Sequence, residues 1–415
     1  MRMRNKQAII FLFVSNIISG FAQGISMIAI PWYFIHNLKQ GSLFSSFYLV
    51  ITALILFWGL YAGTIIDRYS RKKIFIYTNL ICGSIITTIA VFGFINNYIP
   101  SYLVLMVFAL TMFNYNIHYP NLYAFVQEIT EKKYYGKLNS YIEIQGQVTS
   151  MLGGAFAALL LSDIECSVEL PFSFPKWNIQ QVLLMDGISY FIGAVIFFFI
   201  KFSSIVKDKV DLGSILSRLK GGLYYLRNNK SIFRFGVLSY MLFAFTIVQV
   251  HMLTPIYIDN FLNEEVCVYA FAESFYSFGA ILSGFLVYRL LSSYNQYLSI
   301  AFLILSVSFA FLFLVFFKSL IFFFFTMFFL GITNAGVRIL RVTYLFNNIP
   351  NNVIGRATSV FSSINVLVRM SLIGMFSSSF FFEDDNIRWG YFIGFILLFF
   401  TGVFMLFINS KQIKN

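Results

Sequence analysis

Three ionisable side chains stand well inside long apolar stretches of this 415-residue chain: Asp186, Glu273 and Arg369. A charge in hydrocarbon costs several kcal/mol, so each is a candidate functional residue. Glu273 and Arg369 fall at similar depths in their stretches, and we expect them to pair. Such a pair could be purely structural, or Glu273 could take up a proton when the pair opens. Asp186 is a further candidate for proton coupling.

The composition indicates a membrane protein. Of the residues, 59% are hydrophobic and only 11% are charged, and the mean hydropathy is +0.79. Ordinary soluble domains carry about 25% charged residues. The net charge of +12 could indicate nucleic acid as a partner. The bases lie in turns between apolar stretches, however, so we expect a lipid bilayer and no nucleic acid.

Apolar stretches of about 20 residues, the length that crosses hydrocarbon, recur along the chain. The first follows three bases and is too long for a signal-peptide core, so we expect it to be retained. The sequence therefore predicts an all-α integral membrane fold with twelve transmembrane helices. The predicted spans are 8–35, 42–66, 74–95, 100–127, 138–162, 181–202, 232–258, 266–290, 294–317, 319–346, 357–381 and 389–409.

The basic residues predict which side of the membrane each turn faces, because cytoplasmic turns are enriched in Lys and Arg. Even-numbered turns, both termini and the adjoining helix ends hold nearly all of the bases. Odd-numbered turns hold only Lys39, Lys176, Lys318 and Arg388, together with the acids Glu264, Glu265, Glu383, Asp384 and Asp385. We therefore expect a multi-pass protein of the cell (plasma) membrane with both termini in the cytoplasm.

The stretch 204–231 divides the chain. Its leucines recur at helical spacing on one side and bases surround them, which is typical of an amphipathic helix lying on anionic lipid. Short motifs on either side repeat in the same order: Pro31 with Pro255, Gly63 with Gly284, and Gly136 with Gly355. The predicted domains are two related six-helix bundles, 1–203 and 232–415, joined by the cytoplasmic linker 204–231.

Three cysteines do not make a disulfide framework. Cys82 lies in an apolar stretch, whereas Cys166 and Cys267 fall in predicted loops on the same face. We expect no bridge between these two, a bridge being the less favoured alternative. The sequence has no Cys and His set with metal-ligand spacing, and it predicts no metal and no cofactor.

A short turn between the second and third predicted spans concentrates charge that hydrocarbon will not accept. Its pattern, G-x-x-x-D-R-x-x-R-K, resembles the signature loop of the major facilitator superfamily. Gly63 would let a neighbouring helix approach closely, and Asp67 would lie against the positive end of another helix. The pattern is completed by Arg68, Arg71 and Lys72. The resemblance implies that Glu128 completes a charge relay with these bases; the alternative is an ordinary basic turn.

The resemblance also implies that spans one, four, seven and ten line a central substrate cavity. Their polar residues stand among large apolar side chains, which suits an amphipathic organic molecule. Each polar side chain could instead bond a neighbouring helix. The candidates are Asn16, Gln23, Asn114, Asn116, His118, Tyr119, Tyr240, Gln249, His251 and Asn334.

The same resemblance places the fifth and tenth spans in opposite halves. Glu143 lies about one turn into the fifth span, and Arg338 and Arg341 share one face of the tenth. We therefore predict that Glu143 pairs with one of these arginines as a cytoplasmic gate. The alternative is that the arginines snorkel to the interface.

Two loop-to-helix stretches, 125–140 and 349–357, resemble the macrolide-efflux branch of drug:proton antiporters. The resemblance implies a monomeric secondary transporter that exports a hydrophobic or amphipathic small molecule, such as an antibiotic or a peptide product, in exchange for protons. Exporters carry a Gly-Pro pair where this chain has Gly153-Gly154, so a proton-coupled nutrient importer is the alternative. An enzyme is disfavoured because phosphate-binding loops, HExxH and nucleophile elbows are absent.

Overall fold

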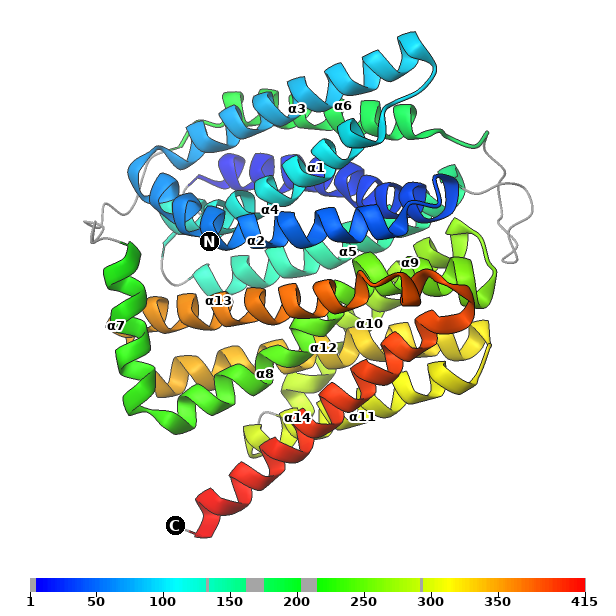
Figure 1. Cartoon of the computed structure of the whole chain (residues 1–415). Helices are drawn as coiled ribbons and strands as arrows, with labels where there is room; N and C mark the ends of the chain where they lie inside the picture. Colours follow the sequence, from blue (N-terminus) through cyan, green and yellow to red (C-terminus); the bar gives the residue numbers. More distant parts are fainter. Residues whose placement is uncertain (1–4, 132–133, 162–174, 203–214, 292–293, 415) are drawn as a thin grey trace. The chain divides into compact units, whose positions relative to one another are not determined.

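The computed structural model describes residues 5–131, 134–161, 175–202, 215–291 and 294–414 (Figure 1). All regular structure within these ranges is helical, in accord with the predicted all-α class. The long helices are α1 (Lys6–Trp32), α2 (Gly41–Arg68), α3 (Arg71–Asn96), α4 (Ser101–Ile129), α5 (Tyr135–Leu161), α6 (Ile179–Phe199), α8 (Lys230–Val248), α10 (Val266–Leu291), α11 (Gln296–Phe316), α12 (Leu320–Asn348), α13 (Asn351–Phe376) and α14 (Arg388–Lys414).

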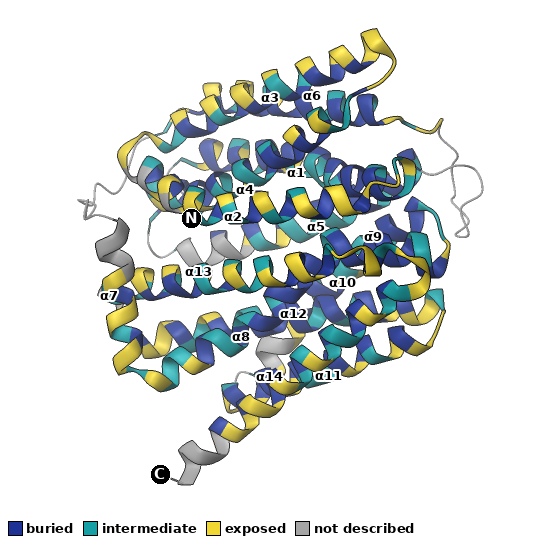
Figure 2. Cartoon of the chain, in the orientation of Figure 1, coloured by how far each residue is buried: buried dark blue, intermediate teal, exposed yellow. Residues whose placement is uncertain are grey.

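Within the described ranges, 11 helical segments are long and apolar enough to cross a membrane. The helix α4 is not among them, and it carries the polar residues Asn114, Asn116 and His118. Its 29 residues nevertheless give a length of about 43 Å, enough to cross hydrocarbon. Large apolar side chains remain exposed along α3 and α14, as expected for helices that face lipid (Figure 2).

The chain forms two compact units. The first unit contains Met1–Asn37 and Leu54–Leu212, and the second contains Leu38–Ala53 and Gly213–Asn415. The N-terminal part of α2 thus groups with the second unit, which the predicted division of the chain after residue 203 did not anticipate.

The sequence repeat around Pro31 and Pro255 produces the same local geometry twice. A π-helical segment, η1 (Tyr33–Asn37), starts two residues after Pro31, and another, η4 (Tyr257–Leu262), starts two residues after Pro255. Proline lacks an N–H and interrupts the regular i→i−4 ladder, which favours such widened turns. A third π segment, η3 (Gln249–Leu253), and the short α9 (Thr254–Ile256) precede η4. The repeat around Pro31 and Pro255 is therefore found in the structure as well as in the sequence.

In the first unit, small residues bring helix backbones together. The helices α3 and α6 run side by side (Figure 1), and a methyl group at Gly83 would lie 3.2 Å from the carbonyl oxygen of Gly187. Likewise, a methyl group at Gly153 of α5 would lie 3.3 Å from the carbonyl oxygen of Phe21 in α1. The Gly153-Gly154 stretch thus packs α5 against α1 without the proline that exporters carry.

The linker helix α7 (Ile215–Asn228) packs against protein. Leu226 is fully buried, and a side chain at Gly222 would overlap the backbone of Arg356 in α13. The prediction that the helix in 204–231 simply lies on lipid is therefore wrong for this face. Leu223 and Tyr224 remain exposed on α7 and are available to a membrane surface.

In the second unit, α10 and α12 make a reciprocal glycine contact. A methyl group at Gly279 would overlap the carbonyl oxygen of Phe328, and one at Gly331 would overlap that of Tyr276. A carbon atom needs about 3.3 Å from such an oxygen. The two backbones can approach this closely only because both positions lack a side chain.

We expect Gly279→Ala to lower the apparent melting temperature of the purified protein strongly, since overpacking a fixed backbone contact costs about 3 kcal/mol. The matched control is Gly284→Ala on the same helix, where a methyl group would meet no atom within 4 Å. Thermal unfolding in one detergent compares the two. Equal melting temperatures for both variants would contradict the close contact.

Candidate functional site

The predicted switch loop is fastened to other helices of the first unit. Arg71 forms a salt bridge with Glu128 at 3.2 Å, and both side chains are partly exposed. The side chain of Asn121 donates a hydrogen bond to the backbone carbonyl of Arg71 at 2.9 Å. Lys72 donates to the carbonyls of Phe198 and Ile200, which end α6. The bases thus connect the start of α3 to the ends of α4 and α6.

Other members of the predicted loop behave differently. A methyl group at Gly63 would meet no described atom within 4 Å, so this glycine does not support a close helix contact in the structure. Arg68 is exposed. The side chain of Asp67 lies outside the described residues, and its predicted contact with a helix end stays a prediction.

The most isolated buried charge of the first unit belongs to Asp186 on α6. Its side chain is completely buried, and neither carboxylate oxygen has a hydrogen-bond partner among the described residues. The Ser26 hydroxyl of α1 faces this carboxyl closely enough to stabilise its ionised form, although the two groups do not meet the geometry of a regular hydrogen bond. Cys82 of α3 and Tyr190 are its other polar neighbours. No basic side chain forms a salt bridge with Asp186 in the described part of the chain.

The predicted cavity residues of the first unit mostly bond neighbouring groups. His118 and Asn16 are joined by a hydrogen bond of 2.8 Å between Nε2 and Oδ1. Asn116 donates to the carbonyl of Met112 on its own helix, and Asn114 reaches the Tyr190 hydroxyl at 3.5 Å. Tyr119 stacks obliquely on Tyr115, and Gln23 is half-buried. The alternative of bonding to helix neighbours thus accounts for several of these side chains.

The second unit contains a buried polar cluster, which we define as Tyr48, Gln249, His251, Thr254, Arg369 and Tyr391. Gln249 donates to the Thr254 hydroxyl at 2.6 Å and to the Tyr391 hydroxyl at 3.4 Å. The rings of Tyr48 and His251 meet edge to face at 6.2 Å. Arg369 lies near enough to both to interact electrostatically. The cluster joins α2, the π segment η3 with the adjoining α9, α13 and α14.

The expected ion pair between Glu273 and Arg369 is not formed among the described residues. Arg369 belongs to the polar cluster, whereas Glu273 is a neighbour of Tyr269 on its own helix. The position of a residue in the sequence predicts its depth in the membrane. The direction in which its side chain points depends on how the helix is rotated about its axis, because successive side chains point about 100° apart. Equal depth was therefore insufficient to predict a contact.

The two predicted gate arginines differ. Arg341 is buried, donates to the carbonyl of Ser239 at 3.0 Å, and lies 3.7 Å from the ring centre of Tyr240. It therefore does not snorkel, because the ring and the carbonyl hold it inside the second unit. Arg338 lies close to it on α12. In the first unit, Tyr123 donates a hydrogen bond of 2.5 Å to Glu143. Pairing of Glu143 with either arginine stays a prediction.

Sequence reasoning missed several contacts. Lys39 and Asp259, which stand 220 positions apart, form a salt bridge of 2.8 Å within the second unit. Asn334 donates to the Tyr276 hydroxyl at 2.7 Å. Cys267 is disulfide-bonded, so the expectation of no bridge is wrong, and Cys82 is a buried free thiol; Cys166 lies outside the described residues. None of the described ranges holds a metal-binding group of His, Cys, Asp or Glu.

A bundle of long apolar helices of this kind is typical of an integral membrane protein. The Major Facilitator Superfamily model matches residues 12–371, and the chain belongs to this family. It is therefore a secondary transporter of small molecules with the fold of that superfamily, and it is not an enzyme.

Macrolide efflux proteins are among the relatives that the chain resembles in sequence. The chain is 21% identical over 229 residues to macrolide efflux protein A of Enterococcus faecalis, a match that covers 54% of this chain and 65% of the relative. Macrolide efflux protein A of Streptococcus pyogenes matches at 21% over 229 residues, which are 54% of this chain and 52% of that protein. The match thus spans only about half to two thirds of these relatives.

Solved structures support the fold over nearly the whole chain. The POT family transporter PepTSo is similar at a TM-score of 0.69 with 12% identity, covering 99% of both chains. The nucleoside transporter NupG gives 0.69 with 13% identity, over 98% of this chain and 99% of that one. A D-xylose-proton symporter gives 0.66 with 12% identity, over 96% and 97%. At these identities the likeness concerns the fold alone.

Proposed function

We propose that this protein exports a hydrophobic or amphipathic small molecule across the cell membrane in exchange for protons. The weak similarity to macrolide efflux proteins supports the direction and the substrate class. The polar residues of the predicted substrate-lining helices stand among aromatic and aliphatic side chains, a lining that suits a bulky molecule with few hydrogen-bonding groups.

The observation that carries proton coupling is Asp186. A completely buried carboxyl that forms no salt bridge with any described residue is costly when ionised, and proton binding removes that cost. Glu273 and Arg369 are the other predicted coupling residues, and they form no salt bridge with each other among the described residues. Asp186 is therefore the leading candidate for proton coupling. The proposal keeps Glu143, Arg338 and Arg341 as the cytoplasmic gate.

The proposal includes the topology and the transport cycle. Both termini lie in the cytoplasm of a multi-pass monomer, because the bases concentrate in the corresponding turns. The six-helix halves 1–203 and 232–415 would rock about a substrate site near the middle of the membrane, with 204–231 as their connection. The salt bridge of Arg71 with Glu128 would stabilise one of the two states.

The test is accumulation of a fluorescent macrolide in cells that produce the protein. An exporter keeps the cells empty, and they fill when an uncoupler collapses the proton gradient. The control is a chain with Asp385→Asn, which changes an exposed loop acid and should leave export intact. Cells that take up no less drug than cells lacking the protein would overturn the proposal for this substrate class.

A proton-coupled importer is the second candidate, because the chain lacks the Gly-Pro pair of exporters and resembles the D-xylose-proton symporter in fold. An importer reverses the outcome of the uncoupler experiment. Its cells accumulate the substrate with the gradient and lose it when the gradient collapses.

A further inference from the structure

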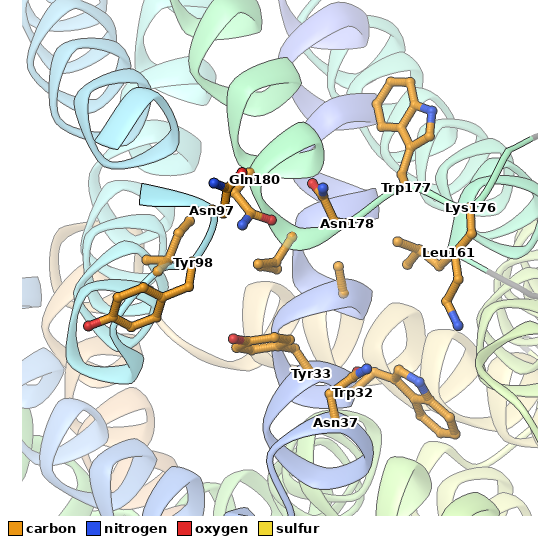
Figure 3. Close-up of a pocket in the computed structure, with 13 residues that line it drawn as sticks. Trp32, Tyr33, Asn37, Asn97, Tyr98, Leu161, Lys176, Trp177, Asn178 and Gln180 are labelled. Atoms are coloured by element: carbon orange, nitrogen blue, oxygen red, sulfur yellow. The ribbon is translucent and has the colours of Figure 1, made fainter. Parts of the chain in front are cut away.

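A cavity of about 330 Å³ lies at one end of the first unit (Figure 3). Its walls come from the end of α1 with η1, the turn after α3, the end of α5 and the start of α6. All of these segments belong to one unit, so the cavity is defined without the second unit. The turns that contribute to it are those predicted to face outward from the cell. Its volume is at the small end of the range of ligand cavities, about 300–1,000 Å³.

Aromatic rings and carboxamides dominate the cavity. Figure 3 shows Asn178 and Gln180 across the space from Tyr33, with Tyr98 and Trp177 on either side. Trp32 is only 5% exposed and stacks on His36 with ring centres 4.8 Å apart. Rings that merely anchored the helix ends in the membrane interface would point outward to lipid, whereas these rings line a partly open cavity.

Gln180 provides a carboxamide that lines this space, and the residue is only 8% exposed. Asn37 and Asn97 add two more carboxamides at the exposed rim. Each carboxamide has both donors and an acceptor, so a bound molecule with hydroxyl groups could form paired hydrogen bonds with them.

The frame around these groups is rigid. Asn178 caps α6 in a capping box, since its side chain accepts from the backbone of Gln181 and the Gln181 side chain accepts in return. The backbone of Trp177 donates to the carbonyl of Leu160 at 2.7 Å, which fixes the wall between α5 and α6. A preorganised site loses little conformational entropy when a ligand binds.

The charge of the lining selects a neutral ligand. Among the described residues that line the cavity, Lys176 is the only charged one; it is exposed, and it already has an interaction partner. The described lining holds no carboxylate that could bind a cation. Carboxamides match the paired donor and acceptor character of neighbouring hydroxyl groups, and aromatic faces pack against the C–H faces of a saturated ring.

We propose that this cavity binds a neutral, hydroxyl-rich saturated ring, such as the pyranose of a glycoside. The ring would pack against the aromatic side chains. Its hydroxyl groups would donate hydrogen bonds to, and accept them from, the carboxamides of Gln180, Asn37 and Asn97. The proposal does not depend on the direction of transport or on the coupling ion, so it can fail or succeed independently of the proposed function.

The test uses the full chain labelled with 5-fluorotryptophan, because two of the four tryptophans, Trp32 and Trp177, line the cavity. The protein is placed in phosphatidylcholine nanodiscs free of glycolipid and of sugar detergents, and methyl β-glucopyranoside is added. We expect the fluorine signals of Trp32 and Trp177 to shift saturably, while those of Trp58 and Trp389 stay in place. Single Trp→Phe variants assign the four signals.

A second arm separates two sources of the same chemistry. Nanodiscs that contain monoglucosyl diacylglycerol present the sugar as a lipid headgroup. A response to the soluble glycoside identifies a site for free glycosides, and a response to the glycolipid alone identifies a headgroup site. Both support the proposal. No saturable shift in either arm, or equal shifts of all four signals, would overturn it.

Variants test the role of the carboxamide. Gln180→Ala should weaken the glycoside response about fivefold to tenfold, because one buried hydrogen bond is lost. The control is Asn96→Ala, which removes an exposed carboxamide that bonds the carbonyl of Phe92 and does not line the cavity. Since Gln180 packs beside Gly93, Asn37→Ala at the exposed rim provides a second variant that leaves the helix packing untouched.

Discussion

Replacing Asp186 with asparagine is expected to abolish substrate accumulation driven by a pH gradient, with a loss of at least about tenfold, or about 1.4 kcal/mol. The asparagine is nearly isosteric, so the packing of α6 against α1 and α3 should survive. It cannot bind and release a proton, however, and the coupling would be lost with it. Substrate exchange without a gradient needs no net proton movement and should remain. Transport into proteoliposomes, with and without an imposed pH gradient, measures both quantities.

The matched control for this prediction is Glu273→Gln in α10, the other carboxyl within the predicted spans that was considered for coupling. If Asp186 carries the proton, the Glu273 variant should still respond to the gradient. If Glu273→Gln lost the response to the gradient and Asp186→Asn kept it, the coupling role would belong to Glu273. Full gradient-driven accumulation in Asp186→Asn would exclude Asp186 as the coupling carboxyl.

The sequence predicted the helices well because lipid leaves a chain few alternatives. A stretch such as 294–317 must satisfy its backbone internally, so its helical state and its approximate ends follow from apolar length alone. The structure places α11 at Gln296–Phe316. The sequence did not predict the π segments η1 and η4, although the repeated Pro-x-Tyr motif stands at the start of both.

Contacts between helices were much harder to predict. The polar cluster around Arg369 depends on the rotation of four segments, and no pattern along the chain reports that rotation. The signal that could have found Tyr48 is weak: it is one of 25 tyrosines. Arg341 was expected to pair with an acid or reach water, but a tyrosine ring and a backbone carbonyl satisfy it instead. Neither partner is distinguishable in the sequence from its many apolar and aromatic neighbours.

Breaking the salt bridge of Arg71 with Glu128 is expected to slow transport about tenfold, whichever residue is changed, corresponding to about 1.4 kcal/mol. Arg71→Glu and Glu128→Arg each place two like charges together, and the exchanged double variant restores a pair of opposite charges. We expect the double variant to regain most of the transport rate. The measurement is the initial rate in proteoliposomes containing equal amounts of folded protein.

The helix ends make this exchange informative. Arg71 begins α3 and Glu128 lies one residue before the end of α4, so each charge stands where the helix dipole disfavours it. The exchanged pair would be favoured by both dipoles, by about 0.3–1 kcal/mol for each charge. Helix stability alone therefore gives no reason for the native arrangement.

The stability of the fold is a minor factor in this comparison. Ion pairs near a surface contribute about 0–1 kcal/mol, so the single variants should still fold, and their melting temperatures should confirm it. A tenfold loss of rate in folded protein then reports on the transport cycle. If the exchanged variant is as stable as the native chain but no faster than the single variants, the charge relay with Glu128 is wrong. The contacts of Lys72 with the end of α6 would then be the remaining candidate for the switch.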